Sequence, residues 1–192
     1  MRACREGFAL LTSRAVFLDR DGVIIEDVPY LSSTEKIKLI SGAAQGIRLL
    51  NKLNFKVIII TNQSAVARGL VTEEELSEIH KELIRKLEDQ GAKIDALYYC
   101  PHHPQGRIKQ FRKVCVCRKP SPGMILKAAK EYSIDLGSSY MIGDKLSDVQ
   151  SARKAGCIPI LIDNNQAAKR NGLLIIQSLS KAATYIGKEI AA

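Results

Sequence analysis

The chain has 192 residues, 46% of them hydrophobic and 26% charged, with a formal net charge of +9. This composition excludes an intrinsically disordered chain, and no apolar stretch approaches the roughly 20 residues that cross a bilayer. The length favours a single domain, and the positive charge favours an anionic partner.

The first 14 residues carry four charged side chains and one short apolar segment, residues 8–11, which is too short for a secretory signal. We expect this segment to be a flexible N-terminal extension and the protein to be cytoplasmic. The five cysteines are an odd number, which argues against a disulfide framework and favours thiol chemistry or metal binding.

The first predicted strand, residues 15–18, ends at two carboxylates, Asp19 and Asp21, followed by Gly22. Side chains two residues apart on a strand share a face, so the carboxylates would crowd together and repel unless a cation or a proton joins them. Mg²⁺ prefers such oxygen ligands, and with it one carboxylate could attack a phosphate while the other moves a proton. A surface Asp-x-Asp-Gly turn is the alternative.

Polar side chains also follow the second predicted strand. A helix predicted over residues 41–54 leads to the near-continuous apolar run 55–60, which is typical of a parallel strand covered on both faces. The run ends at the polar residues 61–64. If the strands are parallel, their hydroxyl and amide groups lie at the same sheet edge as Asp19, although a plain strand-to-loop turn explains them equally well.

The most regular predicted helix begins with a capping box formed by Thr72 and Glu75. Leucine and isoleucine residues follow at helical intervals until Gly91 ends the segment. His80 lies on this helix among charged residues, and we expect it at the surface and not as a metal ligand. A third strand is predicted over residues 94–99.

A possible zinc site follows the third strand. Cys100, His102, Cys115 and Cys117 offer three thiols and an imidazole, which are enough for a tetrahedral Zn²⁺ site. Zinc would fix both ends of a loop that is too polar to form a core of its own. The spacing differs from the familiar Cys-x-x-Cys pattern, so unligated thiols are the alternative, and His103 could replace His102.

The segment from residue 96 to residue 130 contains eight basic residues and no Asp or Glu. Such a concentration of positive charge indicates an anion-binding surface or, equally, a solvated basic loop. Within it, Ser121 is predicted to cap a helix that has Pro122 at its first position and runs to about Tyr132. Lys119 would then lie near the start of this helix, unless it is a salt-bridged surface lysine.

The fourth predicted strand, residues 139–142, again leads to acidic residues, Asp144 and Asp148. Asp148 could cap the following helix, so capping competes with metal binding as its role. The remaining predicted elements are two strands and a closing helix, over residues 158–162, 172–176 and 179–190.

This alternation of strands and helices predicts the α/β class, with a Rossmann-like parallel sheet and helices on both faces. Asp19, Thr61 and Asp144 each lie at the end of a different predicted strand. They would therefore gather at one edge of the sheet, where open α/β sheets bind ligands.

Four motifs, in this order and spacing, resemble those of the haloacid dehalogenase superfamily of phosphotransferases. They are Asp19-Arg20-Asp21-Gly22, Thr61-Asn62, Arg118-Lys119, and Gly143-Asp144-Lys145 with Asp148. Val23 departs from the first motif, which more often has threonine at this position. Within the superfamily, the chain is most similar to the phosphatases that act on heptose bisphosphates, although histidinol-phosphate phosphatases share the zinc loop. The resemblance implies one phosphatase domain over residues 15–192, with a zinc loop over residues 100–117 and no large cap domain.

The resemblance implies hydrolysis of a phosphomonoester, the 7-phosphate of a heptose 1,7-bisphosphate in lipopolysaccharide-precursor synthesis. Asp19 would attack phosphorus and form an aspartyl-phosphate, and Asp21 would protonate the leaving sugar oxygen and then activate water. Thr61 and Lys119 would neutralise the transferring oxygens. Mg²⁺ would be held by Asp19, Asp144 and the main-chain carbonyl of Asp21, and Zn²⁺ would be structural.

The resemblance also places a set of loop and strand-end residues at the substrate. They are Asp27, Val28, Pro29, Tyr30, Asn62, Gln63, Ser64, Arg118 and Lys145. A sugar with a phosphate at both ends would account for a basic stretch larger than one transferred phosphate requires. We expect a monomer that acts on a small sugar phosphate, with no membrane partner.

Two alternatives remain open. The first is histidinol phosphate or a nucleic-acid 3′-phosphate as substrate for the same chemistry. Against nucleic acid, the chain has no Trp, and Phe111 is the only aromatic residue between residues 101 and 124 that could stack on a base. The second is a zinc-stabilised module that binds an anion without turnover, but this leaves Asp19, Asp21 and Asp144 without a common role.

Overall fold

The computed structural model of the chain describes residues 13–164, 168–170 and 172–191. One seven-stranded sheet organises the fold, in the order β3-β2-β1-β4-β5-β7-β6. Its strands are β1 (Ala15–Leu18), β2 (Lys56–Asn62), β3 (Ala96–Cys100), β4 (Tyr140–Gly143), β5 (Ile158–Ile162), β6 (Ala168–Arg170) and β7 (Leu173–Ile176). Six strands run parallel and β6 is antiparallel to β7. The predicted parallel α/β sheet is therefore confirmed.

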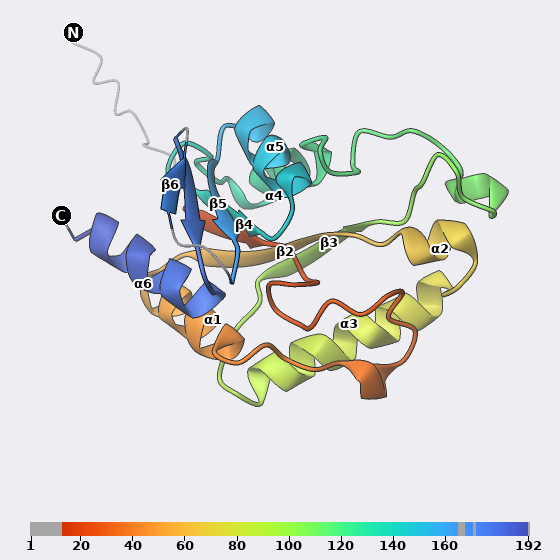
Figure 1. Cartoon of the computed structure of the whole chain (residues 1–192), viewed down its shortest axis with the longest axis horizontal. Helices are drawn as coiled ribbons and strands as arrows, with labels where there is room; N and C mark the ends of the chain where they lie inside the picture. The colour runs from red at the N-terminus through yellow and green to blue at the C-terminus, as the bar shows by residue number, and fades with distance from the viewer. Residues whose placement is uncertain (1–12, 165–167, 171, 192) are drawn as a thin grey trace, which may run out of the picture.

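Helices cover both faces of this sheet (Figure 1). They are α1 (Ala43–Lys52), α2 (Ser64–Arg68), α3 (Glu73–Glu88), α4 (Gly123–Tyr132), α5 (Leu146–Ala155) and α6 (Leu179–Glu189), with 3₁₀ turns η1 (Thr34–Lys36) and η2 (Lys109–Phe111). Residues of α1, α3 and α6 join one apolar core, and residues of α4 and α5 join the other. The sheet is thus sandwiched between two helical layers, as its unbroken apolar strands require.

Strand β1 shows how one sequence builds both cores. Val16 and Leu18 belong to the core beneath α1 and α3, whereas Ala15 and Phe17 belong to the core beneath α4. All four side chains are fully buried. Because successive side chains of a strand point to opposite faces, an uninterrupted apolar run supplies both layers at once.

Two details differ from the sequence-based expectations. Helix α4 begins at Gly123 with Pro122 as its N-cap, so Ser121 does not cap it. The expected flexible extension lies largely outside the described residues, but Ser13, within its expected bounds, forms a β-bridge with Ile134. The short elements α2 and β6 were not predicted, because five and three residues give too little periodicity to detect.

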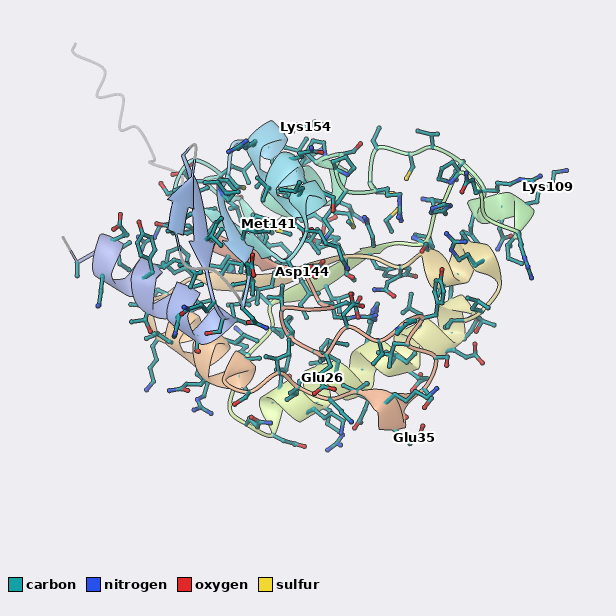
Figure 2. All side chains as sticks on the ribbon, in the orientation of Figure 1. Glu26, Glu35, Lys109, Met141, Asp144 and Lys154 are labelled. Atoms are coloured by element: carbon teal, nitrogen blue, oxygen red, sulfur yellow. The ribbon has the colours of Figure 1, made fainter. Side chains whose placement is uncertain are left out.

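Two connections rise above the carboxyl edge of the sheet. Residues 19–42 contain η1 and a β-bridge between Ile25 and Leu39, and residues 101–122 contain η2. Figure 2 shows Lys109 at the far end of the second connection, well away from Asp144. In the described part of the chain, neither connection forms a large cap domain, and no helix has the length and apolar character needed to span a bilayer.

Candidate active site

Three strand ends bring the predicted site residues to one edge. Asp19 follows β1, Thr61 lies at the end of β2, and Asp144 follows β4. Strand β1 pairs with β2 on one side and with β4 on the other, all in parallel. The carboxyl ends of three neighbouring strands therefore lie side by side, and Figure 2 shows Asp144 at this central position.

Three carboxylates at this edge form an acidic cluster, Asp19, Asp144 and Asp148, with an oxygen of each within 4.8 Å of the others. Burial, together with the charges of Asp19 and Asp148, raises the pKa of Asp144 to about 6. Its Oδ1 is buried and has no hydrogen-bond partner among the described residues. A crowded set of hard oxygen donors with an unsatisfied buried oxygen fits a divalent cation such as Mg²⁺.

Gly22 lets the loop after β1 approach this cluster. Its φ is +78°, in the left-handed region that favours glycine, and an added Cβ would collide with the Asp144 carboxylate. The glycine of the Asp-x-Asp-Gly sequence is therefore required by close packing against the fourth motif, and not only by a turn.

Lys119 faces the cluster from the connection before α4. Its Nζ lies 2.9 Å from Asp19 Oδ1 and 2.5 Å from Asp148 Oδ1, and it donates to the Ile60 carbonyl at 2.8 Å. Although burial disfavours the charged form of a side chain that is only 3% exposed, the two carboxylates raise the pKa of Lys119. An ammonium group is thus held against Asp19, where it can neutralise a phosphoryl oxygen.

Asn62 fixes the backbone that carries this lysine. Its side-chain Nδ2 donates to the Lys119 carbonyl at 3.0 Å, and its Oδ1 accepts from the Lys119 amide at 3.1 Å. The end of β2 therefore positions the third motif directly. The predicted second and third motifs are brought together by this pair of hydrogen bonds.

The Asp21 carboxylate lies outside the acidic cluster, which contains Asp148 in its place. Arg20 Nη2 donates to both Asp21 oxygens, at 2.9 and 3.0 Å, and Gln63 Nε2 donates to Oδ2 at 3.0 Å. The Asp21 side chain is therefore not among the three carboxylates that could hold a metal ion together. This leaves the carboxylate available for proton transfer.

Two adjoining cavities open at this edge. One of about 310 Å³ is lined by Asp19, Thr61, Arg118 and Lys119. A second of about 450 Å³ contains every predicted substrate residue except Arg118: Asp27, Val28, Pro29, Tyr30, Asn62, Gln63, Ser64 and Lys145. The cavities share Asp21, Asn62, Ser64 and Lys145. One continuous site can therefore hold a phosphate and the group attached to it.

The predicted zinc residues also converge. Cys100, His102, Cys115 and Cys117 place their sulfur and nitrogen atoms within 4.8 Å of one another. Sulfur–sulfur separations are 3.2 to 3.5 Å, and His102 Nδ1 lies 3.3 Å from Cys117 Sγ. Three sulfurs and one imidazole nitrogen that face a common centre fit a tetrahedral Zn²⁺ ion. His103 is not in this group, and its Nδ1 accepts from the Gln105 amide.

The expectation that His80 lies at the surface is wrong. The residue is 6% exposed, and its Nε2 lies 3.3 Å from Arg20 Nη1. It occupies α3 four residues after Leu76 and three before Leu83, so it shares their buried stripe. This spacing could have predicted its burial, but the partner that makes burial favourable lies 60 residues away in sequence.

We expect His80 to make the protein less stable in acid. Burial, with a contribution from Arg20, lowers its pKa from 6.5 to about 3, so folding keeps the ring neutral while unfolding lets it bind a proton. Stability from this group is complete above pH 6.5 and is lost as the pH falls. Between pH 7.5 and pH 5 we expect the free energy of unfolding to fall by about 2 kcal/mol more in the wild type than in His80→Gln. Urea unfolding at both pH values measures this difference, and equal losses would contradict a neutral buried His80.

Comparisons with known proteins show which proteins this chain resembles. The profile of the HAD-hydrolase-like family matches residues 116–185. The D-glycero-β-D-manno-heptose-1,7-bisphosphate 7-phosphatase of Salmonella typhi is 44% identical over 177 residues, which cover 92% of this chain and 91% of the relative. The protein of the same name from Escherichia coli O6:H1 is 39% identical over 177 residues, which cover 92% of this chain and 90% of that relative.

A solved structure shows the same fold. The D,D-heptose 1,7-bisphosphate phosphatase from B. bronchiseptica, complexed with magnesium and phosphate, superposes with a TM-score of 0.81 and 33% sequence identity. The superposition covers 92% of this chain and 99% of that one.

Proposed function

Because this chain belongs to the family of D-glycero-β-D-manno-heptose-1,7-bisphosphate 7-phosphatases, within the HAD-like hydrolases, we propose that it removes the 7-phosphate of a D-glycero-D-manno-heptose 1,7-bisphosphate. This reaction would supply precursors for lipopolysaccharide. The observation that carries the proposal is the buried Lys119 ammonium held 2.9 Å from Asp19 beside the acidic cluster. That arrangement suits attack on a bound phosphate better than passive anion binding.

In the proposed reaction, an Asp19 oxygen attacks phosphorus and the bond from phosphorus to the sugar oxygen breaks. Asp21 gives its proton to that oxygen, and then takes a proton from the water that cleaves the aspartyl-phosphate. Lys119 and Thr61 neutralise the transferring oxygens. Asp19, Asp144 and the main-chain carbonyl of Asp21 would hold Mg²⁺, which supplies positive charge near the phosphate.

The larger cavity would hold the sugar. Its wall includes the loop residues 27–30 and Lys145, whose Nζ lies 3.1 Å from Asp27 Oδ2. Arg118 lines the smaller cavity and its Nη1 donates to the His102 carbonyl at 3.3 Å. Arg118 and Lys145 are the cations that we assign to the part of the substrate beyond the transferred phosphate.

The decisive experiment is phosphate release, with Mg²⁺ and with EDTA, from three substrates. These are heptose 1,7-bisphosphate in both anomeric forms, histidinol phosphate and a 3′-phosphorylated oligonucleotide. Strong preference for the heptose, absent in EDTA, is the expected result. Preference for another substrate would keep the chemistry and overturn the proposed substrate, and no release from any of them would overturn the enzymatic function.

We propose that the four-residue sulfur and imidazole cluster holds structural zinc. Replacing one ligand, in Cys115→Ser, should free the loop that ends next to Arg118 and Lys119. We expect substoichiometric zinc, a lower melting temperature and about a tenfold loss of activity. Cys157→Ser is the control for zinc content and activity, because this cysteine lies in an apolar core outside the cluster, where a buried hydroxyl lowers the melting temperature without affecting zinc. Unchanged activity and melting temperature in Cys115→Ser would show that zinc has no structural role.

We propose further that residues 15–192 act as a single domain and that the protein works as a monomer in the cytoplasm. Both apolar cores share the one sheet, which supports a single folding unit. Sedimentation at working concentration tests the monomer, and a stable dimer would contradict it.

A further inference from the structure

The carboxylate of Asp21, the acid–base group of the proposed reaction, accepts hydrogen bonds from the buried guanidinium of Arg20. Arg20 is only 1% exposed. Besides the two contacts from Nη2, its Nε donates to Asp21 Oδ1 at 3.1 Å. A planar guanidinium with several contacts to one carboxylate fixes the orientation of that carboxylate as well as its position.

Helix α3 holds the other end of this guanidinium. His80 Nε2 lies 3.3 Å from Arg20 Nη1, and the imidazole ring packs against Tyr99 with 5.5 Å between ring centroids. His80 is neutral at neutral pH, because burial and Arg20 lower its pKa. Its Nε2 can then accept a hydrogen bond from Arg20, with the ring proton on Nδ1.

Gln63 connects the same network to the phosphate-binding groups. Its Oε1 accepts from Arg20 Nη2 at 3.0 Å, while its Nε2 donates to Asp21 Oδ2 and, at 2.8 Å, to Thr61 Oγ1. Asp21 therefore receives contacts on both oxygens from two fixed donors. Its orientation is set by Arg20 and Gln63, which line the larger cavity but not the smaller one that contains Asp19.

We propose that His80 is a positioning residue for catalysis: it holds Arg20, and Arg20 holds the Asp21 carboxylate in the orientation that proton transfer requires. This inference rests on the phosphatase function proposed above. His80 neither gains nor loses a proton in the reaction, and it touches neither substrate nor metal. A purely structural His80 would fill the core beneath α3 and would affect only stability.

Three variants separate these roles. His80→Gln keeps a hydrogen-bond acceptor for Arg20, His80→Leu removes it, and Ile79→Val is a control for loss of packing at the neighbouring buried position of α3. Competent sites are counted by binding of beryllium fluoride, an analogue of the aspartyl-phosphate, so that unfolded protein does not enter kcat. We expect kcat per competent site to fall by about tenfold or more in His80→Leu and by less than about threefold in His80→Gln, with little change in KM.

Equal kcat per competent site in His80→Leu and Ile79→Val would overturn the proposal.

A second measurement needs no substrate. The buried Nε–H of Arg20, which donates to Asp21, should give a slowly exchanging NMR signal in the wild type and in His80→Gln. We expect this signal to be lost in His80→Leu, and its retention there would also overturn the proposal. If the wild type hydrolyses no heptose bisphosphate, the proposed function fails, while the NMR result still decides whether His80 holds Arg20.

Discussion

Asp19→Asn should lower kcat by about 10⁴-fold or more while leaving the fold intact. The amide cannot serve as the nucleophile, so no covalent intermediate forms on residue 19. One contact that positions this side chain does not need its charge, since Oδ1 accepts from the Arg20 amide at 2.8 Å and an amide oxygen can do the same. Phosphate release from heptose 1,7-bisphosphate, with Mg²⁺ present, measures the loss.

Asp89→Asn is the matched control for this variant. The same substitution then falls on an exposed carboxylate at the end of α3, whose partner is Arg85. We expect wild-type activity from it. The melting temperature of Asp19→Asn should stay close to that of the wild type, because the lost charge reduces repulsion with Asp144 and Asp148 while it weakens the contact with Lys119. Activity of Asp19→Asn within tenfold of the wild type would exclude Asp19 as the nucleophile.

The position of the candidate active site at the carboxyl edge of the sheet was predictable because it follows from two local rules. Uninterrupted apolar runs indicate parallel strands, and parallel strands place their carboxyl ends together. Asp19, Thr61 and Asp144 each come directly at such an end, so their convergence required no knowledge of loop geometry. The zinc residues converge for a related reason, since Cys100 ends β3 and only its partners lie in irregular backbone.

The network behind Asp21 was not predictable in the same way. Arg20 lies between two carboxylates in sequence, a position that says nothing about whether its side chain turns inward. His80 lies at a core-facing position of α3, yet charged neighbours made the surface the simpler interpretation. Arg20 is buried against Asp21, Gln63 and His80, and its contact with His80 spans 60 residues of chain.

Asp148 illustrates a choice that local sequence leaves open. Helix capping and the acidic site were alternatives for it, and the structure shows contacts of both kinds. Its Oδ2 accepts from the Lys145 amide at 3.0 Å at the start of α5, and its Oδ1 contacts Lys119. Only the approach of the connection before α4 to the end of β4 brings Lys119 there, and no local pattern encodes that approach.

Lys119→Met should damage both catalysis and stability, since one ammonium neutralises two buried carboxylates. Without it, Asp19 and Asp148 lose their cation, and breaking a buried ion pair in this way costs about 3–5 kcal/mol. The loss of one preorganised positive group at the phosphate should lower kcat by about 10²–10³-fold. Urea unfolding without Mg²⁺ and steady-state kinetics with Mg²⁺ measure the two effects separately.

The stability loss of Lys119→Met should shrink when the carboxylates are no longer charged. Asp148 already has a raised pKa because of burial and the charge of Asp19. Removal of the ammonium raises this pKa further, so protonation relieves the repulsion between the carboxylates as the pH falls.

Lys119→Arg keeps the charge and should recover most of the stability but only part of the activity. A planar guanidinium cannot occupy the same compact position between two carboxylates and the Ile60 carbonyl. If Lys119→Met has the kcat of the wild type, Lys119 is not a catalytic group. If Lys119→Met is destabilised equally at acid and neutral pH, Lys119 contributes to stability through packing and not through its charge.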